Sequence, residues 1–408
     1  MTVIRLKKAA APVEDLSVET LPMLQSDEVC PFPRPGTDFS GWEKLTLSDG
    51  GDLLRILRVL SRKFSWNSLA DSVLDPGTSD MRAEIEFYKK TRFERKPGTF
   101  FRRPKELPQV CLSEPFPLSE GEVIDLLFQT NFQPRYKPFQ DEFLACRTNQ
   151  KVHARMWRHP PGKSLGRIIA IHGWFMGDHR MSALTLVPGF FYRLGLDVVL
   201  YELPYHGRRM PVTEGGKQSL FPSAHVARTN EGFAQAIYEL RTLAAWLDSE
   251  EKKPIGAIGM SLGGYTAALW ASLDPLSFVI PVVPLVSIAD LVWDVFCKRP
   301  ADADPSKTQE LFGFSREELQ ALYAVHCSLS YKPKVPLNRR LILAGIGDPI
   351  IPRTQPEMLW EHWEKPRIHW FEGGHLGQIA EANALLQVHQ FLLSLKLAHK
   401  ELLPIHGG

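Results

Sequence analysis

The sequence predicts an α/β fold in which a mostly parallel central sheet carries helices on both of its faces. From Glu122 onward, short runs with the composition of strands alternate with runs of helical periodicity, which is typical of parallel sheets built from strand–helix–strand units. The most apolar stretch, residues 278–288, is too short for a membrane span and fits a strand buried on both faces of a parallel sheet. With 44% hydrophobic residues in a chain of 408, a large core can form.

Strands are expected, in chain order, at residues 123–129, 142–147, 152–158, 167–171, 197–201, 255–258, 278–285, 340–344 and 367–371. Helices are expected between the later strands, at residues 183–194, 231–248, 264–273, 356–363 and 376–397. Short connections make the first three strands an antiparallel start to the sheet. Pro281 and Pro284 interrupt the most apolar strand, so its pairing is expected to be irregular or at an edge.

Two domains are expected, with a boundary near residue 120. Residues 1–120 contain helical runs at 52–63 and 79–91 between long connections, which predicts a helical extension of unknown role. Residues 121–408 form the α/β domain. Within it, residues 290–335 show helical runs but no strand between two late strands, so this segment is expected to form a lid over the carboxyl ends of the strands.

Charge and cysteine content exclude several classes of function. The 48 Lys and Arg residues balance 46 Asp and Glu residues to a net charge of +2, without a long basic run, so no nucleic-acid partner is expected. The five cysteines are scattered and show no metal-ligand spacing, which predicts free thiols in a reducing compartment and no metal. Without a signal peptide, an apolar run of about 18 residues or a dinucleotide fingerprint, we expect a cytoplasmic protein that lacks a transmembrane segment and an organic cofactor.

The stretch IGMSLGGYT, from Ile258 to Thr266, carries the strongest chemical signal. It places Ser261 between Gly259 and Gly263, directly after an apolar strand and directly before a helical run. In a nucleophile elbow the chain turns so sharply from strand to helix that the serine is strained, and side chains two positions before and after it would collide. Because a Gly-x-Ser-x-Gly match also arises by chance, the assignment of Ser261 as a nucleophile depends on its partners.

A serine hydroxyl becomes an effective nucleophile when a histidine removes its proton and a carboxylate orients that histidine. Asp348 follows one late strand of the predicted sheet, and His375 lies in a glycine-flanked loop after the next. We therefore predict Ser261, Asp348 and His375 as a catalytic triad. Asp290 is the alternative acid, since Asp348 could instead cap the helix that follows it.

The oxygen of a tetrahedral intermediate needs hydrogen-bond donors that are already in place. The backbone N–H of Leu262, next to the serine, is the first expected donor. The second is expected from the segment His172 to Gly177, which follows a strand, and we predict the N–H of Trp174. The alternative for this segment is an ordinary glycine turn.

With these motifs, residues from about 123 to 397 resemble the α/β-hydrolase superfamily of serine esterases and lipases. The matching stretches are GMSLGG, HGW, GDPIIP, GGHLGQ and YELPYHGRRMP, and the last is similar to a Pro-x-His-Gly segment that this superfamily carries after the next strand. The chain order serine, acid, histidine is also that of the superfamily. Residues from about 230 to 286 are similar to its abhydrolase-domain subgroup of intracellular lipid hydrolases.

The resemblance implies a serine hydrolase that cleaves a small carboxylic ester, with a lipid-like substrate as one option. Phe175, Met176 and Tyr265 are candidates for an apolar acyl site, and plain core packing is the alternative. Arg208 is a candidate for binding an anionic group, with a solvated or structural arginine as the alternative. An acyltransferase or thioesterase with the same triad and a non-catalytic scaffold on the same fold stay open. The oligomeric state is not predicted.

Overall fold

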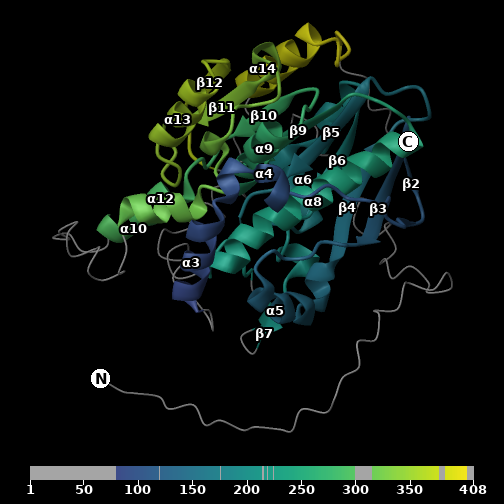
Figure 1. Ribbon diagram of the computed structural model, residues 1–408. Helices are drawn as coiled ribbons and strands as arrows, with labels where there is room; N and C mark the ends of the chain where they lie inside the picture. Colours follow the sequence, from purple (N-terminus) through teal and green to yellow (C-terminus); the bar gives the residue numbers. More distant parts are fainter. Residues whose placement is uncertain are drawn as a thin grey trace.

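A mixed sheet of ten strands runs through the molecule and confirms the predicted α/β fold (Figure 1). The computed structural model describes residues 80–401 except 119, 175, 214–215, 218, 224, 299–314 and 376–381. The strands of this sheet are β1 (Cys111–Leu112), β2 (Phe116–Leu118), β3 (Gly121–Gln129), β4 (Lys151–Arg158), β5 (Gly166–Ile171), β6 (Leu196–Tyr201), β9 (Ile255–Met260), β10 (Val279–Val282), β11 (Leu341–Gly345) and β12 (Arg367–Phe371). Their order is β1-β3-β4-β6-β5-β9-β10-β11-β12, with β2 paired to β3, and β7 (Val212–Thr213) and β8 (Gly216–Lys217) form a separate hairpin.

The parallel part of the sheet extends from β6 to β12, and it is covered on both faces. Strands β5, β6 and β9 are buried at every residue, which explains why the sequence shows them as continuous apolar runs. Ile169 and Ile171 of β5 pack into one core, whereas Ile168 and Ala170 pack into the other. The antiparallel start of the sheet is present between β3 and β4 and between β4 and β6.

Helices supply the outer layers. One core includes side chains of α8 (Val226–Glu250), α9 (Leu262–Leu273) and α13 (Thr354–His362), and the other includes side chains of α6 (His179–Leu186), α7 (Pro188–Arg193) and α14 (Ala382–Ser394). In the described part of the predicted lid segment, α10 (Ile288–Lys298) packs against α12 (Arg316–Tyr323). The role of this segment as a lid stays a prediction.

The predicted strand at residues 142–147 is wrong. Residues Gln140–Ala145 form helix α5, and Arg147–Gln150 form a 3-10 turn. Phe139 and Phe143 are both buried, and a spacing of four residues places them on one side of a helix. Asp141 and Glu142 occupy the first turn, where acidic side chains favour a helix.

Of the two alternatives for the proline-containing strand, irregular pairing is confirmed, and the strand does not lie at an edge. Strand β10 lies inside the sheet, with four residue pairs to β9 but one to β11. The carbonyls of Phe278 and Val282 accept hydrogen bonds from the β9 side, so the alternate residue Pro281 faces β11. A proline has no N–H to donate, and this interrupts the ladder toward β11.

The described part of residues 1–120 packs on the α/β core. Helix α3 (Met81–Thr91) confirms the helical run predicted at 79–91, while the run at 52–63 lies outside the described residues. Tyr88, Phe100 and Phe101 are buried in the same core as α8 and α9, and Figure 1 shows α3 beside α12. The boundary near residue 120 stays a prediction. None of the helices described is both long and apolar enough to cross a membrane.

Glu231 of α8 connects two preceding segments to this helix. One of its carboxylate oxygens accepts hydrogen bonds from the Tyr88 hydroxyl (3.0 Å) and from the N–H groups of Arg135 (2.9 Å) and Tyr136 (2.8 Å). Burial raises the pKa of Glu231 to about 7. The side chain therefore acts as a shared hydrogen-bond acceptor. Its ionisation at high pH costs free energy because the charge is buried.

We expect Glu231→Ala to lower the free energy of unfolding by about 3 kcal/mol, because it leaves several buried donors without an acceptor. Glu231→Gln keeps a carbonyl acceptor in the same place and should stay within about 1 kcal/mol of the wild type. Urea denaturation of the three proteins measures the difference. Equal losses in both variants would contradict the shared-acceptor role.

Candidate active site

Ser261 lies in a strained turn between β9 and α9. Its backbone has φ +56° and ψ −114°, a left-handed region that residues other than glycine rarely adopt. The Ser261 N–H donates to the carbonyl of Val282 (2.9 Å), and the Ser261 carbonyl accepts from the N–H of Tyr265 (2.9 Å). Hydrogen bonds to β10 and to the first turn of α9 thus hold the turn on both sides.

The two glycines that flank Ser261 are required by close backbone contacts. A β-carbon at Gly259 would collide with the backbone of Gly263, and one at Gly263 would collide with the carbonyl of Ile171 at the end of β5. The predicted steric reason for the Gly-x-Ser-x-Gly pattern is therefore present. Helix α9 also approaches β9 closely, because a β-carbon at Gly264 would lie 3.1 Å from the Gly259 carbonyl oxygen.

Asp348 and His375 are brought together from the ends of two neighbouring strands, β11 and β12. Their side chains are 2–3% exposed, and the His375 Nδ1 lies 2.7 Å from the Asp348 Oδ2. The other carboxylate oxygen accepts the N–H groups of Ile350 (2.8 Å) and Ile351 (2.9 Å). Because a carboxylate only accepts, the Nδ1–H of His375 is the donor, which leaves Nε2 as the basic nitrogen of the neutral ring.

Asp290, the alternative acid, lies in a different set of contacts. It accepts hydrogen bonds from Arg316 Nε (2.7 Å) and Gln320 Nε2 (2.8 Å) and thereby joins α10 to α12. Burial alone would raise its pKa, but hydrogen bonds from Ser287, Arg316 and Gln320 lower it overall. These contacts favour a structural role for Asp290, in which it joins the two described helices of the predicted lid segment.

The segment 172–178, which we name the oxyanion loop after its predicted donor Trp174 and of which residue 175 is not described, starts beside Ser261. A β-carbon at Gly173 would lie 3.5 Å from the Cβ of Ser261. The His172 Nδ1–H donates to the Gly173 carbonyl (2.8 Å), and its Nε2 accepts the N–H of Leu203 (3.0 Å). Burial lowers the pKa of His172 to about 4, so the ring is neutral, as an accepting nitrogen requires.

The two predicted oxyanion donors lie on elements that meet at the elbow. Trp174 is 7% exposed in the oxyanion loop, and Leu262 is the fully buried first residue of α9. Of the predicted acyl-site residues, Met176 is half-buried, and its sulfur would lie 3.4 Å from a β-carbon at Gly173. Phe175 lies outside the described residues.

Tyr265 points into the core beside the predicted lid segment. It is 1% exposed, and its hydroxyl lies 2.6 Å from the Nδ1 of His326. Burial lowers the pKa of His326 to about 3, so the neutral ring can accept from the tyrosine hydroxyl. A direct contact of Tyr265 with substrate stays a prediction.

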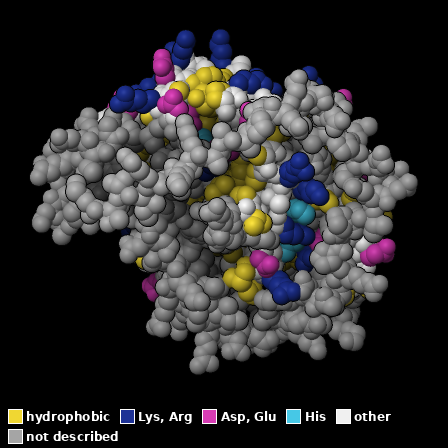
Figure 2. Space-filling view, turned by 90° about the horizontal axis from the view of Figure 1, so that it is seen from below, with side chains coloured by type: hydrophobic (Ala, Val, Ile, Leu, Met, Phe, Trp, Pro, Cys, Tyr) yellow, Lys and Arg dark blue, Asp and Glu magenta, His cyan; other side chains and the backbone are white. Residues whose placement is uncertain are grey.

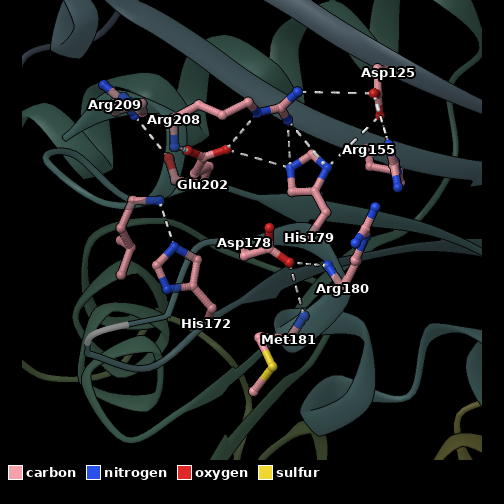
Figure 3. Close-up of polar contacts among 11 residues, drawn as sticks. Asp125, Arg155, His172, Asp178, His179, Arg180, Met181, Glu202, Arg208 and Arg209 are labelled. Carbon is pink, nitrogen blue, oxygen red and sulfur yellow. Dashed lines mark hydrogen bonds and ion pairs between the residues drawn. The ribbon is translucent and has the colours of Figure 1, made fainter. Parts of the chain in front are cut away.

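A group of polar side chains beside the oxyanion loop was missed by the sequence analysis, except for Arg208, whose side chain is 33% exposed. We call it the loop cluster, and it consists of Asp125, Arg155, His179, Glu202 and Arg208 (Figure 3). The guanidinium of Arg208 lies 3.2 Å from Glu202 and 2.9 Å from His179. These contacts favour the structural alternative for Arg208, and its binding of an anionic substrate stays a prediction.

Arg155 anchors the loop cluster to the sheet. It donates two hydrogen bonds to Asp125, at 2.6 and 2.9 Å, so that β3 and β4 are joined by a bidentate ion pair. Asp125, the one polar residue in the run 123–128, was the signal in the sequence for this cluster. In the part of the chain that the structure describes, no group of three or more His, Cys, Asp or Glu residues has the arrangement of a metal site.

Comparisons with known proteins identify the family and the fold of the chain. Residues 94–298 match the model of the family described as Alpha/beta hydrolase domain containing 18. An uncharacterized protein of Mycobacterium tuberculosis strain H37Rv, Rv2627c, is 32% identical over 305 residues, which cover 74% of this chain and 71% of the relative. The protein MT2702 of strain CDC 1551 is 31% identical with the same coverage.

Among solved structures, the acetyl xylan esterase from Paenibacillus sp. R4 is similar, with a TM-score of 0.50 and 16% identity. The match covers 73% of this chain and 93% of the esterase. At this identity the similarity concerns the fold. The match to the family model confirms the resemblance to the α/β-hydrolase superfamily.

Gly259→Ala should be strongly destabilising, by about 3 kcal/mol or more, because the added methyl group meets backbone atoms of Gly263 that cannot move without opening the turn. Gly189→Ala is the matched control, since no atom lies within 4 Å of a β-carbon built there. In helix α7 that change should be neutral or stabilising by up to about 1 kcal/mol. Thermal unfolding of the two variants measures the contrast, and a stable Gly259→Ala protein would disprove the steric argument.

Proposed function

We propose that this chain, which belongs to the Alpha/beta hydrolase domain containing 18 family, is a serine hydrolase that cleaves carboxylic esters through Ser261, His375 and Asp348. The observation that carries the proposal is the strained backbone of Ser261 at the junction of β9 and α9. Such strain is kept where the surrounding structure enforces it, often at a reacting group. The buried hydrogen bond between His375 and Asp348 supports the same assignment.

In the proposed reaction, the Nε2 of His375 takes the proton of the Ser261 hydroxyl as the serine oxygen attacks the ester carbonyl carbon. Asp348 keeps the required tautomer and stabilises the imidazolium that forms. Collapse of the tetrahedral intermediate releases the alcohol, which receives the proton from His375. Water then attacks the acyl-enzyme by the same steps and releases the acid.

The negative oxygen of each tetrahedral intermediate is proposed to accept hydrogen bonds from the N–H groups of Leu262 and Trp174. The first lies at the start of α9, where the partial positive charge of a helix N-terminus adds to the stabilisation. The second belongs to the oxyanion loop, whose start contacts Ser261. Preorganised donors of this kind contribute about 3–4 kcal/mol each to lowering the barrier.

For the substrate, we propose an ester with an apolar acyl group. Among the described side chains on the face from which β7 projects in Figure 1, Figure 2 shows a group of apolar ones with Lys, Arg and His side chains beside it. Trp174 and Met176 are the described candidates for acyl contacts. An apolar surface with a few polar groups at its margin suits a substrate that has one apolar and one polar end.

Incubation of the wild type with a fluorophosphonate should give one covalent adduct, detected by intact-mass spectrometry, and Ser261→Ala should give none. Ser272→Ala, which removes a buried serine further along α9, is the matched control and should keep the adduct. A chain-length series of p-nitrophenyl esters on the same proteins then measures acyl preference. A folded wild type that forms no adduct would contradict the proposal and favour a non-catalytic scaffold.

The assignment of the acid is tested by Asp348→Asn against Asp290→Asn. Loss of the Asp348 charge should lower kcat by about 10³- to 10⁴-fold, because His375 loses the partner that fixes its tautomer. Asp290→Asn should change kcat by less than about threefold, since Asp290 belongs to α10 and its side chain binds residues of α12. Ester turnover at saturating substrate measures both, and the reverse result would move the acid to Asp290.

A further inference from the structure

We propose that the loop cluster positions the oxyanion loop for catalysis, and that Glu202 is the positioning residue at its centre. The inference rests on the proposed function, because it concerns the donor that Trp174 supplies to the reaction. Glu202 is fully buried and directly follows β6. Figure 3 shows its carboxylate beside the side chains of Arg208 and His179.

Glu202 fixes the chain segment that follows β6. One of its oxygens accepts the backbone N–H of Arg208, and the other accepts the Nε–H of the same residue at 3.2 Å. Gly207 has φ +52°, and a β-carbon there would collide with the Glu202 carboxylate. The carboxylate thus lies directly under the backbone of residues 207 and 208.

That backbone in turn supports the end of the oxyanion loop. Gly177 has φ +118°, and a β-carbon there would lie 2.8 Å from the Gly207 nitrogen and 3.0 Å from the Cβ of His206. Such close approach requires glycine at position 177. We therefore expect a shift of residues 206–208 to displace Gly177 and, with it, the end of the oxyanion loop.

His179 gives a second connection, because it is the first residue of α6 and follows the oxyanion loop immediately. Its ring is nearly buried, with Nε2 3.5 Å from Glu202 and Nδ1 3.8 Å from Asp125. Arg208 lies 3.9 Å from Asp125 and completes the group. Asp178 accepts the N–H groups of Arg180 (2.9 Å) and Met181 (3.3 Å) and so caps the same helix.

The two connections hold the oxyanion loop from Gly177 and His179, whereas His172 holds it at its start. Trp174 lies between these points. Displacement of a catalytic group by about 1 Å can cost about 100-fold in rate. Loss of the Glu202 charge would free the Arg208 side chain, loosen residues 206–208, and move the Trp174 N–H from the oxygen that it stabilises in the transition state. Substrate binding before that state would change little, so the effect should fall on kcat.

Ionisation of Glu202 adds a pH dependence that a purely structural contact would not show. Burial raises its pKa to about 7, although Arg208 opposes this. The carboxylate is therefore neutral well below pH 7 and paired with Arg208 well above it. A glutamine at this position resembles the neutral form at every pH.

The other titratable and charged groups around Glu202 come from every element packed against it. They are Asp125 of β3, His153 and Arg155 of β4, His172 of the oxyanion loop, His179 of α6, and His206, Arg208 and Arg209 of the segment after β6. Burial lowers the pKa values of His153, His172 and His206 to about 2, 4 and 3. These histidines stay neutral across the window in which Glu202 titrates.

The test compares Glu202→Gln with Asp274→Asn in the full chain. Asp274 forms another buried ion pair, with Arg241 at 2.6 Å, so its variant controls for the loss of a buried charge pair elsewhere. Fluorophosphonate labelling counts the active sites, and p-nitrophenyl ester turnover per active site is then measured from pH 5.5 to 8.5. Thermal unfolding reports the stability of each variant.

At pH 8.5, Glu202→Gln should lower kcat per active site about 10- to 100-fold with KM within about twofold. The ratio of wild-type to variant kcat should approach one at pH 5.5. The contribution of His375 to the pH dependence of kcat cancels in that ratio, because both proteins contain this residue. Asp274→Asn should keep wild-type kcat per active site, whatever its stability.

A kcat of Glu202→Gln equal to that of the wild type at pH 8.5, or a ratio independent of pH, would overturn the positioning role while leaving the proposed function intact. A folded wild type that reacts neither with fluorophosphonate nor with esters would instead overturn the proposed function, and the positioning role with it.

Discussion

The backbone turn at Ser261 is the constraint on which the rest of the site depends. A positive φ at a serine is unfavourable by about 1–3 kcal/mol, and here it is maintained by hydrogen bonds to β10 and α9 on either side. Those elements can resist the strain because β9 lies in the middle of a parallel sheet and is fully buried. The close approach of Gly263 to the end of β5 then places the oxyanion loop next to the same turn.

The polar groups around this turn divide into two kinds. Asp348 and His375 form a compact pair at the ends of β11 and β12. Backbone N–H groups of the same loop donate hydrogen bonds to the Asp348 carboxylate. The loop cluster lies beyond β5 instead, where it joins β3, β4, α6 and the segment after β6. Buried ion pairs contribute little net stability compared with apolar packing. A cluster of this kind is better explained by the geometry it imposes on the loops than by stability alone.

The sequence allowed the sheet and the glycine-flanked turn at Ser261 to be predicted where the controlling physics was local. Steric conflict at Gly259 and Gly263 is a property of a few adjacent residues, and strands β5, β6 and β9 show their burial directly as apolar runs. The error at residues 142–147 arose because a short mixed segment fits two periodicities, and only packing of Phe139 and Phe143 decides between them. Pro281 was tolerated inside the sheet because one neighbouring ladder could be interrupted. The partners of Arg208 could not be predicted, since Asp125 and His179 are brought to it by the order of strands in the sheet.

The segment before the sheet is connected to the same machinery through α8. Glu84 of α3 accepts the N–H of Ala227 at 2.8 Å in the first turn of α8, where a carboxylate also offsets the partial positive charge of the helix end. At the other end of α3, Lys89 pairs with Glu318 of α12 at 2.7 Å, with both side chains well exposed. An exposed pair of this kind contributes about 0–1 kcal/mol, so the firm contact of α3 is with α8 through Glu84 and the buried Tyr88. Helix α12 is held in a different way, because Leu319, Leu322 and Tyr323 are buried in the same core as Tyr88. Buried apolar side chains rather than the exposed ion pair therefore fix α12 beside α3.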